Sequence, residues 1–196
     1  VSLAVKPGEV HGLVGESGAG KSMIGKAIVG VLPRAVKVIE GAIRLDGKDL
    51  GAMPDRERRQ LIGTRTAMIP QDPMTALNPS RRILGQITDR LILSLGWDRK
   101  KADERAHEIL EEVQIRDIDR VLKSYPHELS GGMRQRVLIG AAFAAEPKLI
   151  VADEPTTALD VTVQKQILKL IADLQRRHGT ALLFVTHDMG VVAKIC

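Results

Sequence analysis

Eight consecutive residues, from Gly15 to Ser22, combine the groups that polyphosphate binding requires: glycines, a lysine and a hydroxyl. The stretch fits the pattern of a glycine, four residues, and then Gly-Lys-Ser or Gly-Lys-Thr. The glycines allow successive backbone N–H groups to converge on phosphate oxygens. Lys21 supplies a full positive charge, and the hydroxyl of Ser22 is suited to ligate Mg²⁺. We therefore predict a polyphosphate site made of Gly15, Glu16, Ser17, Gly18, Ala19, Gly20, Lys21 and Ser22.

The residues on either side of this loop favour the same interpretation. Residues 10–14 form a short apolar run that predicts a buried strand, and apolar residues between 24 and 31 recur at helical spacing. A helix that begins near Lys21 would add the partial positive charge of its N-terminus. The alternative is a glycine-rich turn that binds nothing, and the strand before the loop and the helix after it make this alternative the weaker one.

Polar residues follow two further apolar runs. Residues 149–152 and 181–185 predict buried strands, the first followed by Asp153 and Glu154 and the second by His187. Parallel sheets place ligands beyond the carboxyl ends of their strands. There Asp153 could hold Mg²⁺ through water, Glu154 could orient or deprotonate an attacking water, and His187 could contact a phosphate or that water. A capped turn is the alternative for Asp153 and Glu154, and the phosphate loop in the same sheet favours their functional reading. A structural histidine is the alternative for His187, and its position at a strand end leaves both readings open.

A second anion-binding helix start lies at Ser130, Gly131 and Gly132, directly ahead of a predicted helix. Ser130 is suited to cap that helix, and the two glycines permit close approach of a ligand. An ordinary helix start is the alternative. One triphosphate needs only one such helix start, so we predict that the second serves a nucleotide held by another subunit.

Buried strands that alternate with amphipathic helices predict an α/β fold with a mainly parallel sheet covered on both sides. Residues 41–50 alternate in polarity around Asp46-Gly47, which predicts a hairpin and thus an antiparallel β portion in the N-terminal part. The end of a further strand is expected before Lys6.

The segment from residue 72 to residue 131 differs in character and predicts a helical subdomain inserted into the core. Residues 73–79 read as a loop, residues 83–95 as a helix, and a second amphipathic helix carries apolar residues between 102 and 113. The core would then consist of residues 1–71 and 132–196.

Composition excludes several classes of protein. A hydrophobic content of 44% supplies a sizeable core, yet no apolar run approaches the roughly 20 residues that span a bilayer. The single cysteine, Cys196, excludes an internal disulfide and suits a reducing compartment. The net charge of +5 is scattered, so a nucleic-acid partner is not indicated. The chain begins with Val1, and we expect it to be a fragment of a longer protein.

The order and spacing of these motifs resemble the nucleotide-binding domain of an ABC transporter. The resemblance rests on the phosphate loop, on Leu129-Ser130-Gly131-Gly132, and on the Asp153-Glu154 strand end. It implies ATP and Mg²⁺ as ligands, with Gln71 sensing Mg²⁺ and contacting a membrane partner. It also implies that residues 158–160, Ala158-Leu159-Asp160, cross to a second subunit, and that Asp160 takes part in nucleotide binding.

Three longer stretches, residues 71–79, 124–136 and 153–163, are similar to the ATPases of dipeptide and oligopeptide importers. Met133 stands where the general motif has a glutamine. Importers of nickel and other small solutes share the pattern, so the solute stays open. The family's adenine-stacking aromatic lies upstream of the phosphate loop, and this chain has no aromatic before Trp97.

This resemblance implies an ATP-hydrolysing importer subunit with three kinds of partner: a second ATPase subunit, integral membrane permease subunits and, indirectly, an extracytoplasmic solute-binding protein. It places the subunit peripherally at the cytoplasmic face of the cell membrane. An ABC-type ATPase of DNA maintenance is one rival, although the chain lacks long coiled-coil insertions. A non-catalytic regulator is another, although Glu154 and His187 are both present.

Overall fold

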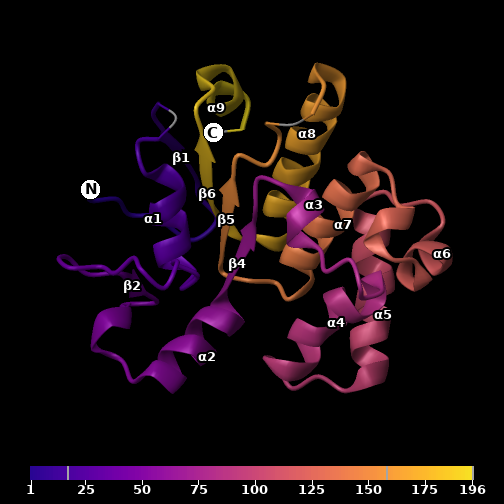
Figure 1. Ribbon diagram of the computed structural model, residues 1–196, viewed down its shortest axis with the longest axis horizontal. Helices are drawn as coiled ribbons and strands as arrows, with labels where there is room; N and C mark the ends of the chain where they lie inside the picture. Colours follow the sequence, from indigo (N-terminus) through magenta and orange to yellow (C-terminus); the bar gives the residue numbers. More distant parts are fainter. Residues whose placement is uncertain (17, 158, 196) are drawn as a thin grey trace.

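A parallel four-stranded sheet forms the centre of the computed structural model, which describes residues 1–16, 18–157 and 159–195 (Figure 1). Its strand order is β1-β6-β5-β4. Strand β6 pairs with β1 on one side and β5 on the other, and β4 pairs with β5, all in parallel. The strands are β1 (Val10–Val14), β4 (Thr66–Ile69), β5 (Leu149–Asp153) and β6 (Ala181–Thr186).

Both faces of the sheet are buried because the two central strands are apolar at every position but their last. Val151, Leu183 and Val185 belong to a core that includes Val29, which directly follows α1 (Lys21–Ile28). The alternate residues of the same strands belong to a larger core shared with α7 (Gly131–Ala144) and α8 (Val161–His178). Figure 1 shows α1 on one side of the sheet and α7 and α8 on the other. The predicted parallel sheet covered on both sides is confirmed.

The predicted hairpin is present as the antiparallel pair β2 (Arg44–Leu45) and β3 (Lys48–Asp49). Its two turn residues have left-handed backbones, with φ of 51° at Asp46 and 76° at Gly47, which a two-residue hairpin of this type requires. A 3₁₀ turn, η1 (Leu50–Ala52), and helix α2 (Asp55–Arg65) follow. The prediction that a strand ends before Lys6 is wrong, because residues 1–5 form no strand.

The segment from residue 72 to residue 131 is helical, as expected. It contains α3 (Pro73–Ala76), α4 (Ile83–Leu93), α5 (Arg99–Glu112), α6 (Ile118–Lys123) and the 3₁₀ turn η2 (Pro126–Glu128). Apolar side chains of α4, α5 and α6 share the larger core with α7. The division of the chain into an ATPase core and a helical subdomain remains a prediction.

Two boundaries in this segment differ from the sequence prediction. Residues 73–76 form a short helix rather than a loop, because the Asp72 carboxylate accepts the Met74 N–H at 2.8 Å and Pro73, at the first helical position, has no N–H that would need an acceptor. Helix α4 ends at Leu93 instead of residue 95, and Gly96 turns the chain with φ 70°.

A group of charged side chains connects α5 to the end of α8. Glu112 of α5 lies 2.8 Å from His178 of α8 and accepts a hydrogen bond from Arg105 at 2.9 Å. Arg105 also donates to the carbonyl of Ala144 at the end of α7. Helix α9 (Met189–Ile195) completes the fold against β6. Among the residues that the structure describes, no helix combines the length and the apolar content that crossing a bilayer would need.

Candidate active site

The phosphate loop joins β1 to α1, as the sequence predicts. Its glycines at 18 and 20 have φ of 85° and 84°, which side chains rarely allow. The Lys21 ammonium lies inside the loop and donates to the carbonyls of Gly15 and Glu16, both at 2.8 Å. Ser17, one of the predicted phosphate-binding residues, lies outside the described residues. The described part of the loop therefore surrounds a buried positive charge at the start of a helix.

Ser22 and Asp153 meet although they lie far apart in sequence. The Ser22 hydroxyl donates to a carboxylate oxygen of Asp153 at 2.8 Å. Asp153 is the last residue of β5 and is only 4% exposed. Hydroxyl and carboxylate oxygens are the ligands that Mg²⁺ prefers, so this pair fits the predicted metal. Among the described residues, no group of three or more His, Cys, Asp or Glu is arranged to hold a metal ion by itself.

Glu154 follows Asp153 with a left-handed backbone, φ 46°, which is uncommon for a residue other than glycine. Its N–H donates to the Val185 carbonyl of β6 at 2.9 Å. Its carboxylate lies 3.1 Å from Nδ1 of His187 and accepts a hydrogen bond from the Thr157 hydroxyl at 2.9 Å. The backbone turn thus directs this side chain along the carboxyl edge of the sheet toward His187.

The surroundings of Glu154 keep its carboxylate ionised. Burial raises the pKa of Glu154, since only 10% of the side chain is exposed. Hydrogen bonds from His187 and Thr157, together with the charges of His187 and Lys21, lower the pKa more, and the net result is a pKa below the ordinary value. An ionised carboxylate at neutral pH is able to accept a proton from water.

Gln71 brings a fourth segment to this site. It directly follows Pro70 at the end of β4, and its amide nitrogen lies 3.5 Å from a carboxylate oxygen of Glu154. Gln71, Glu154 and the phosphate loop border one hollow of about 330 Å³. Its lining residues are Gly18, Gly20, Lys21, Ser22, Met23, Gln71 and Glu154. The structure therefore brings five groups to one edge of the sheet: the phosphate loop, the Ser22–Asp153 pair, Glu154, His187 and Gln71.

The remaining predicted residues do not line this hollow. Ser130 caps α7 and accepts the Met133 N–H at 3.3 Å, and a Cβ placed on Gly131 or Gly132 would meet no atom within 4 Å. Asp160 caps α8 by accepting the N–H groups of Thr162 and Val163. Ala158 lies outside the described residues. Ser130 and Asp160 therefore either bind a ligand outside this hollow or only cap their helices.

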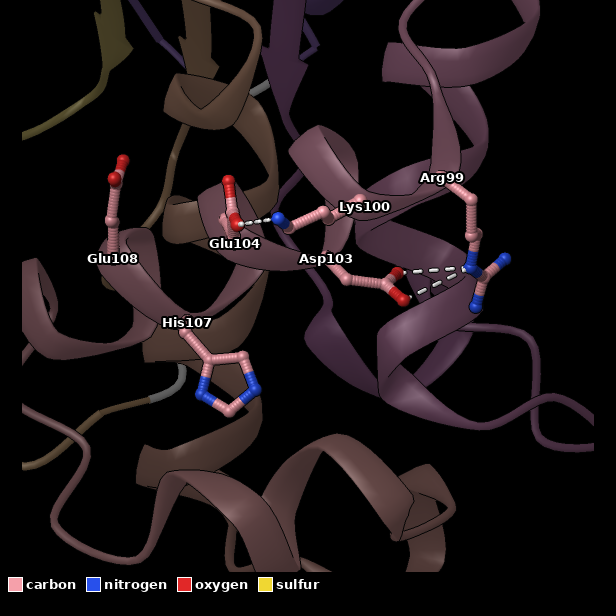
Figure 2. Close-up of a pocket in the computed structure, with 6 residues that line it drawn as sticks. All are labelled: Arg99, Lys100, Asp103, Glu104, His107 and Glu108. Atoms are coloured by element: carbon pink, nitrogen blue, oxygen red, sulfur yellow. Dashed lines mark hydrogen bonds and ion pairs between the residues drawn. The ribbon is translucent and has the colours of Figure 1, made fainter.

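A second hollow, of about 770 Å³, lies on the exposed face of α5 (Figure 2). Arg99 lies 3.0 Å from Asp103, and Lys100 lies 4.0 Å from Glu104. Figure 2 shows these two ion pairs along the helix. Its lining residues are Arg99, Lys100, Asp103, Glu104, His107 and Glu108. Pairs spaced by four residues are typical of a solvated helix face, and the hollow does not contain the predicted site.

Two residues at the site were not predicted from the sequence. Thr157 holds the Glu154 carboxylate, and Met23 lines the hollow. Thr157 lies three residues after Glu154 in sequence. This spacing predicts their contact only once the left-handed turn at Glu154 is known. No sequence signal distinguishes Met23 from the other apolar residues of α1.

Comparisons with known proteins agree with the geometry of the site, because the relatives are ATP-binding proteins. The chain is 49% identical over its whole length to a probable peptide ABC transporter ATP-binding protein of Sinorhizobium fredii, covering 59% of that protein. It is 51% identical over its whole length to a probable D,D-dipeptide transport ATP-binding protein of Escherichia coli, covering 60%. The chain thus spans about three-fifths of the length of these curated relatives.

Solved structures show the same fold. A dimeric ATP-binding cassette in a post-hydrolysis state with ADP and Pi bound superposes with a TM-score of 0.83 at 29% identity, covering 98% of this chain and 80% of that one. CbiO1 of Clostridium perfringens, part of an ABC transporter complex, gives 0.83 at 26% identity, covering 100% and 74%. A family model described as ABC transporter matches residues 1–157. The family resemblance of the sequence is confirmed, and the chain belongs to the ABC transporter family.

Proposed function

We propose that this chain binds and hydrolyses ATP as the ATP-binding subunit of an importer for di- or oligopeptides. One observation carries the hydrolytic part of the proposal: the Ser22–Asp153 hydrogen bond puts a hydroxyl and a carboxylate next to the phosphate loop, directly beside Glu154. The peptide substrate is supported by the relatives, whose names assign them to peptide and D,D-dipeptide transport.

The phosphate loop and Lys21 would bind the phosphate chain of ATP. Among the residues that the structure describes, the Lys21 ammonium donates only to carbonyl oxygens of its own loop, so no carboxylate there competes with the phosphates for it. Ser22 and Asp153, with Gln71, would hold Mg²⁺. When bound, Mg²⁺ neutralises charge that develops on the phosphate oxygens.

Glu154 would act as the general base for the attacking water. The hydrogen bond from Thr157 and the contact with His187 fix the direction of its carboxylate, and a pKa below the ordinary value leaves that carboxylate ionised at neutral pH. His187 is half exposed and would hold the same water or contact the terminal phosphate. Gln71 would sense the Mg²⁺ in the site and contact a membrane partner.

Ser130, Gly131 and Gly132 would bind ATP that is held by the phosphate loop of a second subunit. Three observations support this arrangement: these residues lie outside the hollow of their own chain, the space around both glycines is open, and the ATP-binding cassette with the same fold is dimeric. Asp160, at the start of α8, would take part from the same subunit as Ser130.

The proposal implies further partners. Integral membrane permease subunits would contact Gln71 and the helical segment, and an extracytoplasmic solute-binding protein would act through them. The subunit would lie peripherally at the cytoplasmic face of the membrane.

The full-length protein, purified together with its permease subunits, tests the function. We expect di- or oligopeptides, presented with their solute-binding protein, to stimulate ATP hydrolysis at least severalfold, while nickel salts have no effect. The Lys21→Ala protein is the control for contaminating ATPases. Stimulation by nickel and not by peptides would overturn the substrate class, and hydrolysis equal to that of the Lys21→Ala protein would overturn the activity.

A mixture of two inactive proteins tests the shared site. Lys21→Ala and Ser130→Arg homodimers should each be inactive, whereas the mixed dimer rebuilds one site from Lys21 of one chain and Ser130 of the other. Differently tagged subunits allow this mixed dimer to be isolated. Restored hydrolysis is the expected result. If Ser130 served the ATP of its own chain, every combination would remain inactive.

A further inference from the structure

Gln135 is a buried polar residue that the proposed chemistry does not use. It lies in the second turn of α7 and is 1% exposed. Its side-chain amide donates to the carbonyl of Pro155 at 2.7 Å. Buried amides of this kind are rare without a specific partner, and this one reaches across to the turn that follows β5.

That turn carries Glu154. It departs from the strand with a left-handed backbone at Glu154 and closes through a hydrogen bond from the Thr157 N–H to the Glu154 carbonyl at 3.3 Å. The Thr157 hydroxyl, in turn, holds the Glu154 carboxylate. The carbonyl that Gln135 binds lies between these two residues, so any shift of Pro155 moves both the carboxylate and the hydroxyl that orients it.

The same helix begins at the predicted binding site for the second nucleotide. Ser130 caps α7, and Gln135 lies five residues further along it. A displacement of the helix N-terminus is therefore transmitted to the Pro155 carbonyl through one side chain whose reach is fixed by burial. Packed side chains of this kind move together with their backbone.

We propose that Gln135 is a positioning residue for Glu154, which links the Ser130 helix start to the general base of the same chain. The proposal rests on the proposed function, since it assumes that Glu154 acts on the water that attacks ATP. Misplacing a base by about 1 Å costs up to about 100-fold in rate. Binding of ATP by the phosphate loop does not involve the 154–157 turn, so it should change little.

A merely structural role for Gln135 is the alternative, and the chain offers a matched control for it. Gln175 of α8 is also buried, at 5% exposed, and donates to the backbone carbonyls of Gly8 at 2.8 Å and Thr180 at 2.9 Å. It has the same chemistry as Gln135 but lies away from the turn that carries Glu154. Loss of a buried glutamine therefore affects stability at both positions and the active site at only one.

Gln135→Met and Gln175→Met, made in the full-length protein, separate the two roles. Methionine keeps the length and volume of glutamine and removes the donor. For Gln135→Met we expect kcat at least tenfold lower than for Gln175→Met, with the KM for ATP and the Kd of a fluorescent ATP analogue within about threefold of the parent. Gln135→Asn, which keeps an amide one methylene shorter, should recover part of the lost kcat.

Each result decides between the roles. Equal kcat for the two methionine variants, or a loss confined to KM, would overturn the assignment. A Gln135→Met protein that does not fold while Gln175→Met folds would assign Gln135 to the fold itself and would overturn the assignment too. If the parent protein fails to hydrolyse ATP above the Lys21→Ala background, it is the proposed function that fails, and this result is read before the Gln135 comparison.

Discussion

Two glutamate–histidine pairs in this structure predict opposite outcomes for the same substitution. Glu154 lies 3.1 Å from His187 beside the phosphate loop, whereas Glu112 lies 2.8 Å from His178 at the junction of α5 and α8. Both carboxylates are nearly buried, with 10% and 13% of the side chain exposed. We expect Glu154→Gln to stop ATP hydrolysis with little effect on stability, and Glu112→Gln to lower stability without slowing hydrolysis.

The expected loss of activity in Glu154→Gln follows from the role of the carboxylate. An amide cannot accept the proton of the attacking water, and a general base contributes about 100- to 10,000-fold in rate. The amide oxygen can still accept the hydrogen bond from Thr157, so the turn keeps its shape. ATP binding should stay within about threefold, and the free energy of unfolding within about 1 kcal/mol, because the side chain borders a hollow open to solvent.

The expected loss of stability in Glu112→Gln follows from its partners. Glu112 contacts Arg105 at 2.9 Å and Arg177 at 3.4 Å as well as His178. Breaking a fully buried ion pair costs 3–5 kcal/mol and an exposed one at most about 1 kcal/mol. This partly exposed cluster lies between these limits, at about 2 kcal/mol, which corresponds to a melting temperature lower by roughly 4–8 °C for a chain of this size.

Both variants are measured with the same two assays: release of phosphate from ATP, and urea or thermal unfolding in the absence of nucleotide. Agreement requires both halves of the prediction. Hydrolysis within about threefold of the parent in Glu154→Gln would refute the role of that carboxylate. Equally, a folded Glu112→Gln protein that has lost hydrolysis as fully as Glu154→Gln would show that the assay reports general damage and not the loss of a base.

Three further predictions follow from other contacts. Lys21→Ala should lower hydrolysis at least about 100-fold, the scale of removing a main electrostatic stabiliser, and weaken binding of ATP analogues in a filter assay. Gly25→Ala should cost about 1–3 kcal/mol in urea unfolding, because its new Cβ would lie 2.8 Å from Val151, whereas Gly63→Ala, with its nearest contact at 3.9 Å, should cost nothing. Burial raises the pKa of Glu112, but His178 and Arg105 lower it more, so its net pKa lies below the ordinary 4.5. The stability that Glu112 contributes is therefore fully present at pH values above the ordinary pKa of 4.5. The difference in free energy of unfolding between the parent and Glu112→Gln should shrink as the pH falls through the lowered pKa.

The phosphate loop could be predicted from the sequence because its function depends on local backbone conformation. Gly18 and Gly20 have positive φ where the pattern requires glycine, and α1 begins at Lys21, as expected. The hairpin at Asp46-Gly47 was predictable for the same reason. In such motifs the residue types and the conformation they permit are nearly the same information.

Contacts that depend on tertiary packing were not predictable. Thr157 reaches Glu154 only because the chain adopts a left-handed turn at a glutamate, a conformation that glutamate does not favour by itself. Gln135 looks like any polar residue of a helix until packing buries it against the Pro155 carbonyl. The short helix at residues 73–76 depends on one cap from Asp72, a local contact that two prolines in residues 73–79 obscured.

Strand order explains why the site needed the structure for its assembly. Chain order places β5 before β6, yet β6 lies between β1 and β5 in the sheet. The paired residues Val14 and Thr186, and Asp153 and Val185, bring three strand ends to one level. His187 directly follows β6, the strand between β1 and β5, and its imidazole lies 3.1 Å from the Glu154 carboxylate although it comes last in sequence. The strand order thus explains a contact between His187 and Glu154 that an isolated histidine after an apolar run does not imply.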